Sequence, residues 1–166
     1  MTNSAVKRQN SLHPLLFLLF GMILFMGSGC RKSESSELYH RFSDHSWARF
    51  NVLSFELPVE KVNACNIYLF ARFSPDFPYE TLDFNMTMNT PSGEERINEY
   101  QMPVKSASGG FCIECRKDSC MGIILLKKEL NMAKPGILRI EIENLTPRLN
   151  TEGILGIGVR MVPSGK

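Results

Sequence analysis

Apolar and polar residues alternate along most of the chain from Trp47 onward. This period of two is typical of strands with one buried face. Seven segments show the alternation or a short apolar run and are predicted to be strands: 53–57, 67–73, 82–88, 96–102, 121–126, 138–142 and 155–161. Their spacing predicts an all-β fold, an antiparallel two-sheet β-sandwich of the immunoglobulin or jelly-roll kind with about seven to eight strands.

Turn residues sharpen part of this pattern. Thr90-Pro91-Ser92-Gly93 separates two predicted strands and is typical of a tight turn, so residues 82–102 are predicted to form a hairpin. Residues 125–132 allow two turns of helix, ended by Lys134-Pro135-Gly136, or equally a strand or loop. No alternation of strands with helices is seen, which argues against a doubly wound nucleotide-binding fold.

The first 29 residues have the organisation of an export signal. Lys7 and Arg8 are the charges of the first 14 residues, and Leu15 to Met26 is a twelve-residue apolar run. As a helix this run would reach about 18 Å, less than the roughly 30 Å of a bilayer's hydrocarbon core. We therefore predict a signal peptide at residues 1–29 and no permanent membrane span.

Small residues and a cysteine follow the apolar run directly. Gly27-Ser28-Gly29-Cys30 resembles a bacterial lipobox, in which the cysteine thiol accepts lipid before cleavage. The alternative is an ordinary secretory signal with an incidental cysteine. We predict lipidation at Cys30, a lipidated N-terminus and tether over residues 30–45, the sandwich domain over 46–163 and a tail at 164–166. Arg31 follows Cys30 where inner-membrane retention would use Asp, so we expect the outer membrane, with its face left open.

Composition and charge exclude two classes. The chain is 43% hydrophobic and 22% charged, which is unlike disordered proteins. It carries 19 Lys and Arg against 17 Asp and Glu, and the excess of two lies in the leader. From Cys30 onward the balance is zero without a basic cluster, so nucleic acid is not an expected partner.

Four cysteines remain besides Cys30, namely Cys65, Cys112, Cys115 and Cys120. Structural disulfides or unpaired thiols are the favoured interpretation, because the envelope is oxidising. A zinc site and a thiol-redox pair are the alternatives; zinc commonly uses two close ligand pairs, and a redox pair needs a helix N-terminus. Four cysteines allow three full pairings, and the sequence does not choose among them.

Catalytic signals are scarce. After the leader the chain has only His40 and His45, both ahead of the first predicted strand, and no known nucleophile, metalloprotease or phosphate-binding motif. Paired carboxylates such as Glu94 and Glu95 are interpreted as solvent-facing strand positions. We therefore predict a protein that is not an enzyme and has no metal or cofactor.

Aromatic residues and one arginine are the remaining candidates. Phe77, Pro78 and Tyr79 lie in a turn between two predicted strands, where they either close one end of the sandwich or form a contact surface. Trp47 has the same two interpretations. Arg72 lies in an otherwise apolar strand four residues before Asp76, so we expect it to pair with a carboxylate or with carbonyls in the adjoining turn.

Several of these segments together resemble the gliding-motility lipoprotein family GldH of Bacteroidetes-type bacteria. They include the lipobox, Trp47 with a Val-x-Ser-Phe-Glu strand, Asn-Ile-Tyr-Leu-Phe-Ala-Arg-Phe, Phe-Pro-Tyr-Glu-Thr-Leu and Gly-Ile-Leu-Gly-Ile-Gly-Val-Arg. Phe77 and Thr81 stand where family members typically have Tyr and Asn. The cysteine-rich segment after Gly109 departs further from the family.

The resemblance implies a non-enzymatic envelope lipoprotein of the gliding and type IX secretion machinery, acting through protein contacts. Because the mature chain is neutral, docking by shape and apolar contact is expected. A second hypothesis is a glycan-binding module in which Phe77 and Tyr79 stack on sugar. A third places redox or metal chemistry at Cys112, Cys115 and Cys120.

Overall fold

The computed structural model describes residues 35–60 and 63–164, so the leader, Cys30 and residues 31–34 of the predicted tether lie outside the described residues. Within the described ranges no helix is long and apolar enough to cross a membrane. The regular structure of these ranges consists of strands, which confirms the all-β prediction. The strands are β1 (Ser36–Arg41), β2 (Ser46–Ala48), β3 (Val52–Val59), β4 (Ala64–Phe73), β5 (Thr81–Asn89), β6 (Glu95–Pro103), β7 (Glu114–Arg116), β8 (Ser119–Asn131), β9 (Gly136–Asn144), β10 (Asn150–Glu152) and β11 (Ile154–Pro163).

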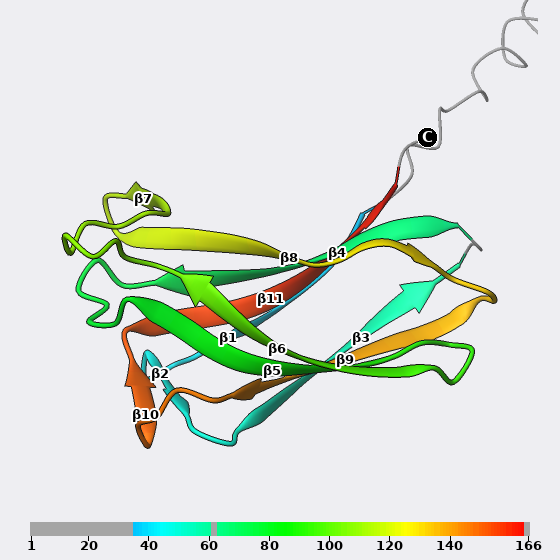
Figure 1. Cartoon of the computed structure of the whole chain (residues 1–166), viewed down its shortest axis with the longest axis horizontal. Coiled ribbons are helices and arrows are strands. Elements are labelled where there is room, and N and C mark those ends of the chain that lie inside the picture. The colour runs from blue at the N-terminus through cyan, green and yellow to red at the C-terminus, as the bar shows by residue number, and fades with distance from the viewer. Residues whose placement is uncertain (1–34, 61–62, 165–166) are drawn as a thin grey trace, which may run out of the picture. The chain divides into compact units, whose positions relative to one another are not determined.

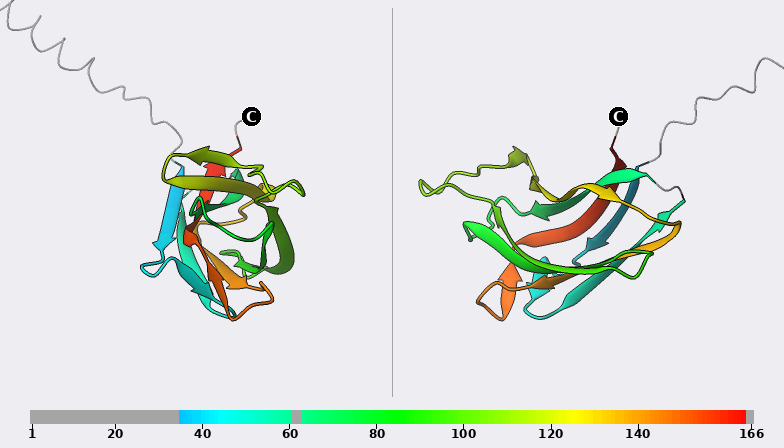
Figure 2. Two further views of the ribbon diagram at one scale, coloured as in Figure 1. Left: turned by 90° about the vertical axis from the view of Figure 1, so that its left-hand side faces the viewer. Right: turned by 45° about the vertical axis from the view of Figure 1, so that its right-hand side comes forward.

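Two antiparallel sheets face each other and form the sandwich (Figures 1 and 2). The five-stranded sheet has the order β1-β11-β4-β8-β7, and the four-stranded sheet has the order β3-β9-β5-β6. β10 and β2 form a small additional ribbon. The seven predicted segments correspond to β3, β4, β5, β6, β8, β9 and β11, so the long strands were predictable from the alternation.

The alternating apolar residues form the core between the sheets. In β3, for example, Leu53, Phe55, Leu57 and Val59 are buried while the residues between them are exposed. Burial of one such side chain contributes about 1.5–3 kcal/mol, so the pattern itself fixes which face of each strand turns inward. Trp47 is fully buried, and its indole N–H donates to the carbonyl of Asn51 at 3.1 Å.

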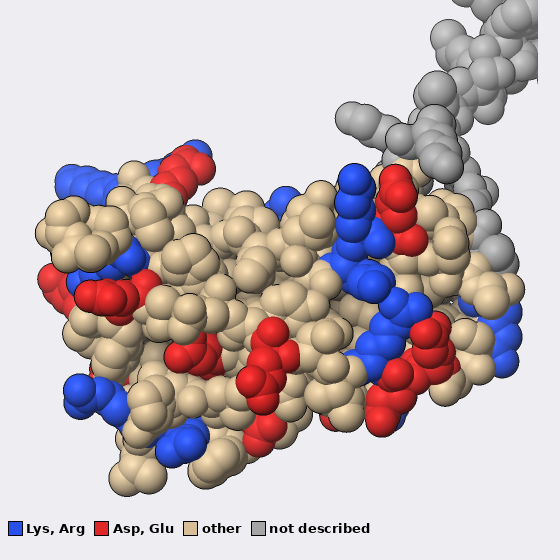
Figure 3. Space-filling model, in the orientation of Figure 1, with Lys and Arg blue, Asp and Glu red and all other residues tan. Residues whose placement is uncertain are grey.

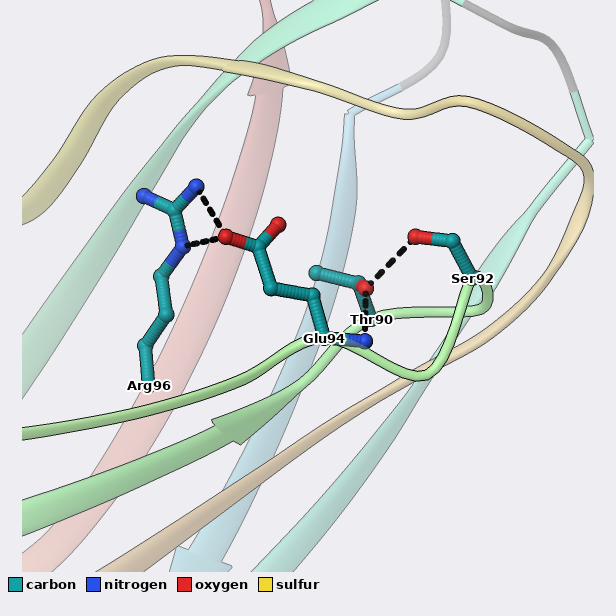
Figure 4. Close-up of polar contacts among 4 residues, drawn as sticks. All are labelled: Thr90, Ser92, Glu94 and Arg96. Carbon is teal, nitrogen blue, oxygen red and sulfur yellow. Dashed lines mark hydrogen bonds and ion pairs between the residues drawn. The ribbon is translucent and has the colours of Figure 1, made fainter.

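The predicted hairpin is present as β5 and β6, and its turn is closed by side chains (Figure 4). The Thr90 hydroxyl lies 2.9 Å from that of Ser92 and accepts the backbone N–H of Glu94 at 3.1 Å. Gly93 has a φ of 89°, a conformation that glycine adopts without strain. The Arg96 guanidinium then pairs with the Glu94 carboxylate at 2.7 Å.

Residues 125–132, for which a helix was one expectation, continue β8 instead. The pairing of β4 with β8 shifts register next to Ile67, as expected for bulges. Leu126 and Leu130 both face the core, because residues four apart lie on the same face of a strand as well as on the same face of a helix. This spacing alone therefore does not distinguish the two structures.

The folded sheet also begins earlier than residue 46, where the sequence analysis placed the start of the domain. β1 lies within the segment assigned to the tether, yet its six residues pair with β11, from Ser36 opposite Met161 to Arg41 opposite Gly156. β1 is an edge strand whose side chains are mostly exposed. Because neither of its faces is buried, it lacks the alternation that marks the other long strands.

Candidate functional site

The outer face of the five-stranded sheet is built around two glycines of β11. Gly158 is paired with Tyr39 on β1 and with Phe70 on β4. The two aromatic rings stack across it, with centroids 5.8 Å apart and planes inclined by 8°. A methyl group at Gly158 would overlap the Phe70 ring, and one at Gly156 would overlap the Tyr39 hydroxyl. The glycines therefore allow the rings to lie flat over the strand.

An apolar surface continues from these rings across β8. Phe70 pairs with Ile123 and Tyr68 pairs with Leu125, so all four residues face outward. Ile123 is 52% exposed and Leu125 is 42% exposed, whereas Phe70, which stacks with Tyr39, is only 5% exposed. We call the surface formed by Tyr39, Tyr68, Phe70, Ile123 and Leu125 the aromatic face. In Figure 3 the surface over the middle of β8 is largely without charged side chains, which gather toward its two ends.

A cross-strand ion pair borders the aromatic face. The Arg160 guanidinium lies 5.5 Å from the centroid of the Phe70 ring, and its Nε donates to the Glu37 carboxylate at 2.6 Å. This contact places a cation against the ring, and the ion pair links the neighbouring strands β1 and β11. Arg160 thus already has a carboxylate partner within the chain, namely Glu37.

Two other arginines lie beside the aromatic face at one end of the sheet. Gly156 pairs with Arg41 on β1 and with Arg72 on β4, so the two arginines flank a residue that has no side chain. A pocket of about 420 Å³ opens there. We call it the arginine pocket; it is lined by Tyr39, Arg41, His45, Arg72, Ser74, Asp118 and Leu155.

The electrostatics of the arginine pocket are unbalanced. Among residues 35–60 and 63–164, neither Arg41 nor Arg72 has a carboxylate oxygen within 4.0 Å. Burial raises the pKa of the Tyr39 hydroxyl, and the positive charges of Arg72 and Arg41 act in the opposite direction. Both guanidinium groups therefore influence the same hydroxyl. Arginine offers a planar fork of donors that suits carboxylates and phosphates.

Among the described residues, Arg72 forms neither the expected ion pair with a carboxylate nor a hydrogen bond to a carbonyl of the adjoining turn. Arg72 lies on the exposed outer face of β4 and has no hydrogen-bonded partner in the described part of the chain. The chain turns after Phe73, and the backbone N–H of Asp76 donates to the Ser74 hydroxyl at 3.1 Å. The turn satisfies its own polar groups without the arginine.

The aromatic turn closes the end of the sandwich. Phe77 is fully buried and packs on Phe73 at 4.6 Å between ring centroids, while Tyr79 meets the Phe77 ring edge-on at 5.2 Å. Packing was the favoured interpretation of these residues and of Trp47, and it is confirmed. Stacking of a sugar on Phe77 is contradicted, because its ring has no exposed surface. Pro78 between them is exposed.

The cysteines have three different environments. Cys115 and Cys120 form a disulfide across the β7–β8 hairpin, one of the pairings that the sequence left open. Cys65 is a buried thiol that donates to the carbonyl of Leu130, and burial raises its pKa to about 11. Cys112 is exposed. Within the described ranges, no three His, Cys, Asp or Glu side chains converge as metal ligands would.

Sequence reasoning singled out Arg72 and missed the residues that surround it. Tyr39 and Arg41 were assigned to the tether, and Gly156 and Gly158 were interpreted only as the polar phase of a strand. One signal was available: β4 has Tyr68, Phe70 and Arg72 on the face opposite its core residues. Large aromatic residues on both faces of a strand indicate that its outer face is also partly covered. Here Tyr39 stacks on Phe70.

A family model for the GldH lipoprotein matches residues 34–161. The chain belongs to the GldH lipoprotein family. Membership implies a lipid-anchored protein of the cell envelope, in a family that is linked to gliding motility and is not known as an enzyme family. The matched region begins just before β1, so it includes both arginines of the pocket and all residues of the aromatic face.

Other comparisons add little to the GldH assignment. No curated protein sequence matches this chain. Among solved structures, the chain is similar to dimeric latent PorU from Porphyromonas gingivalis, with a TM-score of 0.36 and 9% sequence identity. The similarity covers 83% of this chain and 14% of the PorU chain. The chain thus spans a small part of the length of that protein.

Proposed function

We propose that this GldH-family chain is a non-enzymatic, lipid-anchored docking protein of the gliding and type IX secretion machinery. Its aromatic face would bind a protein partner of that machinery. The observation that carries the proposal is the aromatic face itself, an exposed apolar surface beside two arginines without carboxylate partners. Lipid at Cys30 would hold the domain at a membrane, for which we propose the outer membrane.

The residue types of this surface are those of protein interfaces. Interface centres are enriched in Tyr, Phe and Arg and are poor in Lys, Glu and Asp. Tyr39 on β1 and Phe70 and Arg72 on β4 lie on either side of β11, so they belong to one continuous face of a rigid sheet. Exposed apolar side chains gathered in this way favour a protein or membrane contact over solvent.

A pair of isoleucines provides the test. Ile123 on β8 belongs to the aromatic face and is 52% exposed, while Ile97 on β6 lies on the outer face of the other sheet and is 59% exposed. Ile123→Glu and Ile97→Glu would each be placed in the full-length gene of a deletion strain. The measurements are secreted type IX cargo, gliding where the organism glides, and the amount of the variant protein in membranes.

We expect Ile123→Glu to abolish cargo secretion or gliding at unchanged protein level, because a charge would be desolvated at the interface. We expect Ile97→Glu to behave as wild type. Equal function of both variants would contradict docking through the aromatic face. A deletion strain without any defect in secretion or gliding would contradict the role in that machinery.

A further inference from the structure

We infer that the arginine pocket binds a carboxylate of the partner protein, supplied by an acidic side chain or a C-terminus next to the segment on the aromatic face. The inference rests on the proposed docking function and adds the chemistry that the partner must present. Arg41 and Arg72 would hold the carboxylate, with the hydroxyls of Tyr39 and Ser74 as neutral donors at the pocket wall.

The arrangement of the two arginines suits one anionic group. They lie on β1 and β4, in one row across the sheet on either side of Gly156. Neighbouring strands are about 4.8 Å apart, so Cα atoms two strands apart are separated by roughly 10 Å. Long arginine side chains can reach across this distance from both sides, and the space over Gly156 between them holds the Tyr39 hydroxyl, a further donor. Two guanidinium forks then face one site.

The pocket does not supply the anion from within. Asp118 is the one acidic residue of its lining, and no carboxylate oxygen of the described residues lies within 4.0 Å of either guanidinium. The neighbouring Arg160, in contrast, is paired with Glu37. Like charges brought together without a counter-ion are unfavourable unless an anion binds, so the pocket favours an external carboxylate or another planar anion.

The position of the pocket favours a protein over the anchoring membrane as the source of the bound anion. Arg41 is the last residue of β1, and Ser36, its first residue, is on the side from which the chain leads back to Cys30. A strand of this length extends about 17 Å, so the pocket lies at the opposite end of β1 from Ser36. With lipid at Cys30, as proposed, we therefore favour a protein partner over the phosphates of the anchoring leaflet as the occupant.

The aromatic face and the arginine pocket also define a spacing. Tyr39 belongs to both, and the row of Gly156 follows that of Gly158 after two residues. Successive rows on one face of a strand are about 6.6 Å apart. A bound extended segment would therefore carry an acidic residue within about two positions of the apolar residue that contacts Ile123, which lies in the same row as Gly158 and Phe70.

Photo-crosslinking with the full-length protein in living cells tests the inference. Benzoylphenylalanine at position 125, on the aromatic face, captures the partner, and mass spectrometry maps the site of attachment. The adduct is compared in three backgrounds: unchanged, the double variant Arg41→Gln with Arg72→Gln, and the control Arg139→Gln. Arg139 lies on β9, in the other sheet, where it pairs with Glu56.

We expect the adduct yield to fall at least tenfold in the double variant and to remain in the control. The mapped peptide should contain Asp, Glu or a C-terminal carboxylate within about five residues of the attachment site. Thermal unfolding of the purified double variant should match wild type; if it does not, the single variant Arg72→Gln takes its place, with Arg72→Lys expected to recover part of the yield by keeping the charge.

Three results would overturn the inference in distinguishable ways. Full adduct yield in the double variant would mean that the aromatic face docks a partner without the arginines, so the proposed function would stand and the carboxylate site would fall. A mapped peptide without a carboxylate, or an adduct with lipid alone, would also refute the site. No protein adduct at position 125 in the unchanged protein would refute the docking face itself.

Discussion

The outer faces of the two sheets differ in kind. The outer face of the five-stranded sheet has aromatic rings on a glycine strand, exposed isoleucine and leucine, and two unpaired arginines among the described residues. The outer face of the four-stranded sheet is mainly hydrophilic and acidic, and its exposed large apolar residues are Val52 on β3, Ile97 on β6 and Ile137 on β9. Its charged residues are Glu56, Asp83, Glu95, Glu99, Arg139, Glu141 and Glu143.

The comparison of the two outer faces indicates which of them is adapted to contact with solvent. In antiparallel sandwiches the outer faces are usually polar, and the four-stranded sheet follows this rule. Cross-strand pairing on it joins opposite charges, as in Arg139 and Glu56 at 2.6 Å. The five-stranded sheet instead leaves apolar area and arginine charge without a partner in the same chain. This contrast can be tested by substituting one residue on each outer face and comparing the effects of the two substitutions.

The largest difference in stability is expected at the glycine strand. In Gly158→Ala the new methyl group meets the Phe70 ring and the carbonyl of Leu38, so β1 and the ring must shift. We expect a loss of about 1–3 kcal/mol in the free energy of unfolding, as for overpacked cores. Thr87→Ala, on the outer face of the four-stranded sheet, should change it by about 0.5 kcal/mol or less.

Urea unfolding of both variants measures these values. A loss equal to that of Thr87→Ala would mean that Tyr39 and Phe70 move aside freely, and the aromatic face would then not be a rigid surface.

A smaller difference is expected between the two cross-strand ion pairs. Arg160→Gln removes both the pair with Glu37 and the contact with the Phe70 ring, so we expect a loss of about 1 kcal/mol. Arg139→Gln removes only an exposed pair with Glu56, worth about 0.5 kcal/mol or less.

Thermal unfolding at low and high salt separates the two contributions. Added salt should abolish the effect of Arg139→Gln and leave part of that of Arg160→Gln, because packing on a ring is not screened. If Arg160→Gln and Arg139→Gln lower the stability equally at high salt, the contact of Arg160 with the Phe70 ring does not contribute to stability.

The smallest effect concerns the alkaline limit of stability. Burial raises the pKa of Tyr39, so above the ordinary tyrosine value of about 10 the folded state holds this proton more tightly than the unfolded state. Its contribution is complete below about pH 10 and is lost as the pH rises through the folded pKa. Arg72→Gln removes a charge that lowers this pKa, so the pKa should rise further.

Difference absorbance titration at 295 nm against Tyr39→Phe measures the Tyr39 pKa. The pKa of Tyr100, which is raised by burial alone, provides the internal reference and should not change in Arg72→Gln. A pKa of Tyr39 that is insensitive to Arg72→Gln would mean that the guanidinium does not face the hydroxyl.

The alternation of apolar and polar residues was sufficient to predict the long strands but not their neighbours. β2, β7 and β10 have three residues each, too few to display a period. β1 is an edge strand without a buried face, so its sequence is as polar as that of a linker and does not indicate a strand. The core positions of Trp47 and Phe77 could be predicted, because large aromatics near strand ends are usually buried.

The site was less predictable, because it depends on register. Arg41 and Arg72 are 31 positions apart in the sequence numbering, and only their common partner Gly156 brings them into one row. A shift of one residue in either pairing would turn one arginine to the opposite face. Local spacing, which suggested a partner for Arg72 near the adjoining turn, contains no information about this register.

β1 also determines how the domain would carry force. If lipid at Cys30 and a partner at the arginine pocket hold the protein as proposed, tension between them would enter β1 near its first residue and leave near its last, and so would run along this strand. Such a load acts parallel to β1 and shears its six paired positions with β11 together, whereas a perpendicular load would separate them one after another. A protein connected in this way is suited to transmit a pull.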